Sequence, residues 1–305
     1  KYASELKGKV IFSVSVENTL IAGGLGFVMQ VHEWFMALLG TKIVSIEPWY
    51  EYRKDANGNL ARVDYERDYG VEGLSVIYDN ISVKVGGREV GIRVWKGKKG
   101  WKTVILIQEL PDENGNLHHT NVIYSDNKYG NESWEKFTAF FAKATLEVMK
   151  REEENRKNAL GENYKPPLVW GNDAQCCGVM ALARAERDNK ESTLKGAHLS
   201  FTTHTFANRG YFGPVGENNC NLIRIMNLLG VPEKYWSAFV RDGYIDMTSG
   251  AARLSDSVNT VSRKQKFVLD RDGYDPNVKY TAITNADDLE RARSIIKKIY
   301  KELYD

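Results

Sequence analysis

A glycine-rich turn between an apolar strand and a helix is the feature that most restricts how this chain can fold. Residues 9–16 (KVIFSVSV) are apolar and β-branched, which predicts a buried strand. The turn Ala22-Gly23-Gly24-Leu25-Gly26 follows, and residues 27–39 then carry apolar side chains at helical spacing up to Gly40. Residues 41–46 form a second apolar run. This order predicts the start of a Rossmann-like, doubly wound α/β fold with a mostly parallel sheet.

The pattern changes between residues 51 and 108, where glycine-containing pairs separate alternating stretches. Asn57-Gly58 and Gly86-Gly87 are typical of hairpin turns, the second lying between residues 81–85 and 88–94. We expect residues 51–108 to be a β-hairpin insertion, an antiparallel excursion from the main sheet. Trp49, Trp95 and Trp101 either pack these hairpins together or line a sugar-binding surface, as do the nearby Tyr50 and Tyr52.

Alternation of helices and strands returns in the rest of the chain. Residues 132–155 predict a long helix with an apolar face, whose members are Phe137, Phe140, Phe141, Ala144 and Val148. Strands are expected at 168–171, 198–203 and 258–261, and helices at 175–187 and 287–304. Because no repeat or long linker interrupts this order, residues 1–305 are expected to form one domain.

Charge and cysteine content argue against several classes of function. The 42 Lys and Arg residues nearly balance the 40 Asp and Glu residues, so no broad basic field is expected for nucleic acid or an anionic membrane. No run reaches the ~18 apolar residues of a membrane span. Cys176, Cys177 and Cys220 fit neither a disulfide framework nor a zinc site. We expect reduced thiols, a cytoplasmic location, no metal and no cofactor.

The glycine turn itself has two chemical interpretations beside a purely structural one. Backbone N–H groups in such a turn, together with the N-terminus of the next helix, can hold a phosphate, although similar turns also bind nothing. A nicotinamide enzyme is one candidate, because Gly24 and Gly26 fit part of the dinucleotide pattern and Glu47 lies about 20 residues on. Met29 argues against it, since close helix–strand packing there requires Gly or Ala.

Several segments, in order, resemble bacterial glycogen synthases and plant starch synthases. The turn at residues 23–26 is similar to the Lys-x-Gly-Gly-Leu-Gly-Asp donor loop of that family. The other similar segments are 124–130 (YSDNKYG), 170–175 (WGNDAQ), 201–212 (FTTHTFANRGYF) and 255–262 (SDSVNTVS). They resemble, in turn, the family's Tyr-Gly segment before a helix, its His-Asp-Trp, its Thr-x-His-Asn-x-x-x-Gln-Gly and its Ala-Asp-x-Val-x-Thr-Val-Ser. The resemblance extends from residue 9 to about residue 285.

The resemblance implies the N-terminal half of a GT-B fold, in which two Rossmann-like domains face each other across a sugar-nucleotide site. It implies transfer of a glucosyl unit from a donor such as ADP-glucose or UDP-glucose to an α-glucan-like acceptor, with a C-terminal donor-nucleotide domain in cis. That second domain is expected to be absent from this chain, so the isolated chain is expected to be inactive.

The resemblance also implies roles for individual residues. His204 matches the residue beside the transferred glucose. The alternative is a structural role, in which the His204 ring makes its hydrogen bonds within the end of the strand. Donor binding is implied for Gly23, Gly24, Gly26 and Thr205, and acceptor binding for Asp173, Asn172 and Tyr129. Asp173 is also a good helix N-cap for residues 175–187, and Tyr129 fits a core position equally well.

The chain departs from the family pattern at five of these positions. Ile21 and Phe27 replace the Lys and Asp of the donor loop, Asn172 and Ala174 replace the His and Trp, and Thr205 replaces an Asn. Loss of the lysine removes a charge-assisted bond to phosphate, a contact of about 1.5–3 kcal/mol. A non-catalytic, glycosyltransferase-like carbohydrate-binding module is therefore the second functional hypothesis.

Overall fold

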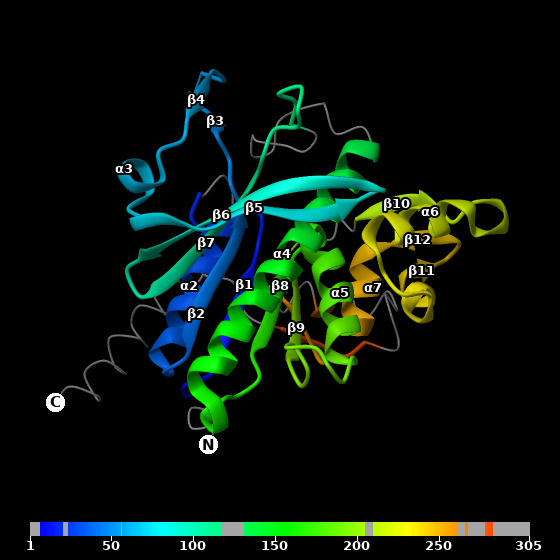
Figure 1. Ribbon diagram of the computed structural model, residues 1–305. Helices are drawn as coiled ribbons and strands as arrows, with labels where there is room; N and C mark the ends of the chain where they lie inside the picture. Colours follow the sequence, from blue (N-terminus) through cyan, green and yellow to red (C-terminus); the bar gives the residue numbers. More distant parts are fainter. Residues whose placement is uncertain are drawn as a thin grey trace.

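A large mixed sheet forms the centre of the molecule (Figure 1). The computed structural model describes residues 7–20, 24–55, 57–117, 131–204, 210–261, 266–267 and 278–282. The strand order is β14-β13-β9-β8-β1-β2-β7-β6-β5. From one edge to the other these strands are Tyr280–Ala282, Ser257–Thr260, His198–Thr203, Leu168–Asn172, Val10–Val14, Lys42–Pro48, Lys102–Glu109, Arg88–Lys99 and Glu72–Val85. Neighbours from β14 to β7 are parallel, which confirms the Rossmann-like, mostly parallel prediction.

Helices cover both faces of this sheet. Side chains of successive strand residues point to opposite faces, and β8 shows which helix lies on each side. Trp170 contacts His32 of α2 (Gly24–Leu38). A Cβ on the next residue, Gly171, would lie 2.5 Å from the sulfur of Met180 in α5 (Cys177–Arg187), so this approach requires glycine. Helix α2 therefore covers one face, and α5 covers the other.

Helix α4 (Asn131–Leu160) packs beside α5 on the second face. Its expected apolar face is confirmed, because all five predicted members are buried: Phe137, Phe140, Phe141, Ala144 and Val148. The rings of Phe137 and Phe141 stack with centroids 6.0 Å apart. This packing closes the sheet face opposite the one that carries α2.

Both hairpins predicted between residues 51 and 108 form. The first is separate from the main sheet, whereas the second is part of that sheet. Strands β3 (Tyr52–Lys54) and β4 (Leu60–Arg62) pair around Asn57-Gly58 as a separate hairpin. Strands β5 and β6 pair around Gly86-Gly87, and β6 pairs with β7 at the edge of the main sheet. Strand β7 lies inside the expected insertion, yet it is parallel to β2 and belongs to the main sheet. Its central residues Val104–Ile107 are buried on both faces, as is usual for a strand of a parallel sheet.

Aromatic residues near the hairpins pack against one another. The Trp49 ring stacks on Trp95 with centroids 5.1 Å apart and tilts against Tyr65 of α3 (Tyr65–Tyr69) at 4.7 Å. Tyr50 is buried in the same cluster with Leu20. The packing interpretation therefore holds for Trp49, Tyr50 and Trp95, whereas Trp101 is 41% exposed.

The elements after β8 were predicted only in part. The helix at 175–187 and the strand at 258–261 are confirmed as α5 and β13. The pattern did not predict α6 (Cys220–Leu229), α7 (Met247–Leu254) or the small sheet of β10 (Tyr211–Pro214), β12 (Tyr244–Asp246) and β11 (Val240–Arg241). The helix expected at 287–304 lies outside the described residues. No helix in the described ranges is long and apolar enough to cross a membrane.

Candidate functional site

Three predicted site residues meet where strands β8 and β9 end. The two strands are parallel with Asn172 opposite Thr202, so their carboxyl ends lie side by side. Asn172 ends β8, Asp173 follows it, and His204 follows β9. The Asn172 Oδ1 lies 3.4 Å from His204 Nε2, and the backbone N–H of His204 donates to Asp173 Oδ1 at 3.4 Å. Ligands of doubly wound folds bind at this edge of the sheet.

His204 is a neutral imidazole. Burial, and to a smaller extent the proximity of His32, lower its pKa to about 3. Because the amide oxygen of Asn172 can only accept, the contact between the two residues places a proton on Nε2 of His204. The other ring nitrogen, Nδ1, is then an acceptor. A ring of this kind can recognise a hydroxyl group without changing its charge.

The side chain of Asn172 faces the His204 ring and not the solvent. Its side chain is completely buried, and its amide group donates to the carbonyl oxygens of Val14 and Trp170, both at 3.3 Å. These bonds fix the oxygen that faces the imidazole. In this structure Asn172 orients the histidine, and direct acceptor contact by Asn172 stays a prediction.

His32 is a second imidazole at this site that the sequence motifs did not reveal. It lies on α2, and its ring stacks on Trp170 with centroids 5.9 Å apart and an angle of 24°. The indole N–H of Trp170 donates to Thr202 Oγ1 at 2.8 Å, which holds the stacked ring in place. Burial lowers the pKa of His32 to about 4. The helix that follows the glycine turn is thus in contact with the strands that carry Asn172 and His204.

Asp173 has a strained backbone. Its φ of 64° and ψ of 178° fall in a region that is populated almost only by glycine. It stands before the short 3-10 helix η2 (Ala174–Cys176), but its side chain makes no capping bond there, and α5 begins only at Cys177. The helix-cap interpretation is therefore wrong. Strain at a buried carboxylate beside His204 is typical of a functional site.

Two substitutions test whether that strain is real. Asp173→Gly is expected to be more stable than Asp173→Ala by about 1–3 kcal/mol, because glycine relieves the backbone strain and alanine does not. Both variants lose the same carboxylate, so the difference between them isolates the backbone. Urea denaturation at pH 7 measures it, and equal midpoints would show that residue 173 is unstrained.

The glycine turn is described in part. Gly24 begins α2, and Gly26 is buried in its first turn. That turn carries no acidic residue, so no local carboxylate offsets the positive end of the helix dipole. The predicted donor residues Gly23 and Thr205 and the predicted acceptor residue Tyr129 lie outside the described residues.

The structure does not support the nicotinamide alternative. The carboxylate of Glu47 is buried and accepts hydrogen bonds from the backbone N–H of Thr19 at 2.7 Å, from Thr19 Oγ1 at 2.8 Å and from Ser45 Oγ at 2.6 Å. It is thus occupied by protein donors rather than presented to a ribose. Met29 belongs to α2 and is fully buried, at a position where a dinucleotide fold has a small residue.

Metal-binding and disulfide chemistry were also considered. Within the described ranges, no group of three or more His, Cys, Asp or Glu residues is placed to hold a metal ion. Cys176, Cys177 and Cys220 are free thiols. Burial raises the pKa of Cys176 to about 12 and that of Cys177 well above its usual range. These two thiols are therefore poor nucleophiles.

The mostly parallel sheet with helices on both faces is the fold of a GT-B glycosyltransferase catalytic domain. A model of the starch synthase catalytic domain matches residues 10–268, so the chain belongs to that family. It is a starch synthase-like glycosyltransferase domain.

The fold is similar to that of a solved starch synthase structure. The catalytic domain of starch synthase IV from Arabidopsis thaliana, bound to ADP and acarbose, has a TM-score of 0.62 and 18% identity over 92% of this chain. The chain covers 52% of that structure's length. An alpha,alpha-trehalose 6-phosphate synthase from Burkholderia multivorans is matched over 88% of this chain and 44% of its own, with 10% identity and a TM-score of 0.30. Among curated proteins no match is found.

Proposed function

We propose that this domain transfers a glucosyl unit from a nucleotide-diphospho-sugar to an α-glucan-like acceptor, in concert with a second Rossmann-like domain in cis. The observation that carries the proposal is the meeting of His204, Asp173 and Asn172 at the carboxyl ends of β8 and β9, beside the helix that follows the glycine turn. The Arabidopsis structure, which is bound to ADP and acarbose, supports a nucleotide donor and a glucan-like acceptor.

The site residues would act by position and hydrogen bonding. The neutral His204 bonds a hydroxyl of the transferred glucose, and Asn172 keeps its ring in the required orientation. The Asp173 carboxylate accepts bonds from acceptor hydroxyls. In retaining transfer with front-face attack, the acceptor hydroxyl oxygen bonds to the anomeric carbon as the bond to the phosphate oxygen breaks, without a protein nucleophile. The proton of the hydroxyl passes to the leaving diphosphate. The facing domain then supplies the cations that stabilise the diphosphate as it leaves.

Isothermal titration with ADP-glucose, UDP-glucose, ADP and maltooligosaccharides tests the proposal. Parent protein is expected to bind a nucleotide sugar, and His204→Ala is expected to weaken that binding about 2–10-fold, the value of one hydrogen bond. Binding of ADP alone should be unchanged, because His204 addresses the sugar. His198→Ala is the matched control, since His198 begins the same strand at its opposite end and is half exposed.

The alternative function is a glycan-binding module without transfer. It is favoured by Ile21 and Phe27, which stand where the related synthases carry the Lys and Asp of their donor loop. Heat from maltooligosaccharides alone would support this module and overturn the transferase. Heat from none of the four ligands would overturn both.

A further inference from the structure

The chain segment just before the glycine turn is buried although it is a loop. Residues 15–20 connect β1 to the turn, and each of them is at most 2% exposed. Loops normally lie on the surface, because their backbone polar groups need partners. Here the partners come from the protein. Ser15 N–H donates to Ile46 O at 3.2 Å, and Tyr50 Oη donates to Val16 O at 2.9 Å.

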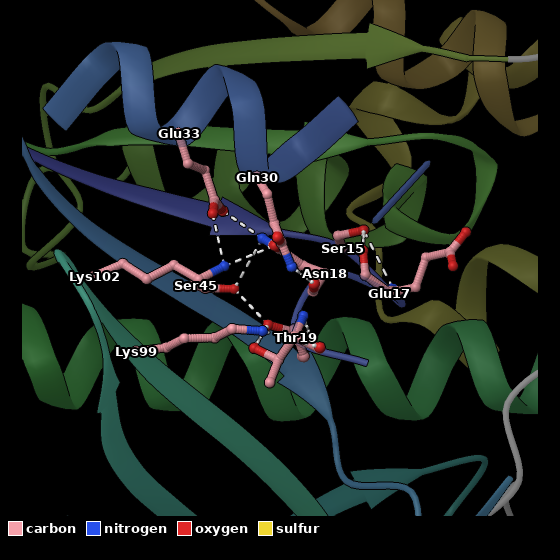
Figure 2. Close-up of polar contacts among 10 residues, drawn as sticks. Ser15, Glu17, Asn18, Thr19, Gln30, Glu33, Ser45, Lys99 and Lys102 are labelled. Atoms are coloured by element: carbon pink, nitrogen blue, oxygen red, sulfur yellow. Dashed lines mark hydrogen bonds and ion pairs between the residues drawn. The ribbon is translucent and has the colours of Figure 1, made fainter. Parts of the chain in front are cut away.

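Asn18 is the centre of this segment (Figure 2). Its amide nitrogen donates to Glu33 Oε1 on α2 at 2.5 Å and to Ser45 Oγ on β2 at 3.2 Å. Its amide oxygen accepts from Lys102 Nζ on β7 at 2.6 Å, and the same ammonium lies 2.8 Å from Glu33 Oε2. One side chain thus joins the loop to three elements and uses both of its amide protons.

The backbone of residues 15–20 also forms hydrogen bonds with side chains of other elements. Gln30 of α2 donates to Asn18 O at 2.7 Å, and Lys99 of β6 donates to Thr19 O at 3.4 Å. The Thr19 N–H is bound by Glu47, which Ser45 also contacts. We call Asn18, Glu33, Ser45, Glu47 and Lys102 the Asn18 network.

The Asn18 network consists of hydrogen bonds and one ion pair between buried side chains. The side chains of Glu33 and Lys102 are 0% and 2% exposed. Apolar residues of the same volume would stabilise such a site about equally well, so a buried ionic network is best explained by the unique geometry that it imposes. The geometry imposed here is that of residues 16–20, which lead into the glycine turn, against the middle of α2 at Gln30 and Glu33.

We propose that Asn18 is a positioning residue of the donor site. The Asn18 network holds residues 16–20 against the middle of α2, at Gln30 and Glu33, and so fixes the orientation of that helix. The diphosphate of a nucleotide sugar then meets backbone N–H groups at the start of the helix that are already arranged. This inference rests on the proposed function for its ligand, and on the network alone for the fixed backbone.

Asn18→Ala is the principal test, because it removes the three amide contacts and keeps the Glu33–Lys102 ion pair. Nucleotide-sugar affinity is expected to fall about 10-fold, whereas maltooligosaccharide affinity changes less than about 2-fold, since Asp173 and His204 do not touch the network. Amide hydrogen exchange of residues 16–20 and 24–28 should accelerate about 10-fold or more, and exchange in β8 and β9 should not change.

Val148→Ala is the matched control for lost stability, because Val148 is fully buried in α4 on the opposite face of the sheet. Equal losses of nucleotide-sugar affinity in Val148→Ala and Asn18→Ala would overturn the proposal. Gln30→Ala, which removes a single contact to the loop backbone, replaces Asn18→Ala if that variant does not fold. It should give smaller changes in the same pattern.

The two proposals fail separately. If the parent protein binds no nucleotide sugar, the donor function is refuted, and the exchange data alone decide the role of Asn18. Local acceleration confined to residues 16–20 and 24–28 then supports a turn fixed by the network. Unchanged exchange in Asn18→Ala refutes it, whatever the ligand.

Discussion

Replacing Lys102 by methionine is expected to lower the free energy of unfolding by about 3–5 kcal/mol. The Glu33 carboxylate is fully buried, and Lys102 is its ion-pair partner at 2.8 Å. Without the ammonium, Glu33 either stays charged in a dry site or takes up a proton, and both outcomes cost stability. Burial already raises the pKa of Glu33, while Lys102 opposes that rise. Urea denaturation at pH 7 measures the loss.

Two further variants show whether the loss comes from the unpaired carboxylate. The double variant Glu33→Leu/Lys102→Met removes both members of the ion pair, so neither is buried without its partner, and it should recover most of the lost stability. Arg151→Met breaks an exposed ion pair with Glu147 and should change stability by less than about 1 kcal/mol. A double variant as unstable as the sum of its single substitutions would mean that the ion pair is not the cause.

Acid is expected to destabilise the folded domain through His32 and His204. Their folded pKa values are lowered to about 4 and about 3, against 6.5 for an ordinary histidine. Between those limits the unfolded chain binds protons that the folded chain does not, so stability is complete above pH 6.5 and falls as the pH drops. At 1.36 kcal/mol per pH unit for each group, about 2–4 kcal/mol is lost together by pH 5.

Urea denaturation of the parent and of His32→Gln/His204→Gln at pH 7, 6 and 5 measures this effect. The double variant lacks both titrating rings, so its stability should fall less between pH 7 and pH 5 than that of the parent. The carboxylates contribute equally to the pH dependence of both proteins, so their effect cancels in the comparison. Parallel pH curves would show that the two imidazoles are not kept neutral by the fold.

Local patterns carried most of the fold prediction. The first strand, the glycine turn and the next helix were predicted because β1 is a continuous apolar run and α2 has helical periodicity up to Gly40. The place of β5 and β6 was not predictable in the same way. A hairpin pattern fixes which two strands pair, but only contacts with β7 decide whether the pair extends the main sheet.

The family resemblance predicted Asp173 and His204 as site residues, because each lies in a local sequence motif. It did not predict that the two lie side by side at the ends of β8 and β9, which the structure shows. The Asn18 network carries no such signal, because Lys102 lies 84 residues from Asn18 and 69 from Glu33. A lysine and a glutamate that far apart resemble ordinary surface residues until the fold buries them.

The Asn18 network also constrains how this sequence can diverge. Substitution of Lys102 or Glu33 alone leaves a charge buried without its partner, whereas a joint change to apolar residues does not. A lineage that loses the pair one residue at a time must therefore pass through a destabilised ancestor. Positions 18, 33 and 102 are expected to be inherited or replaced as a set, and this coupling protects the approach to the glycine turn from gradual drift.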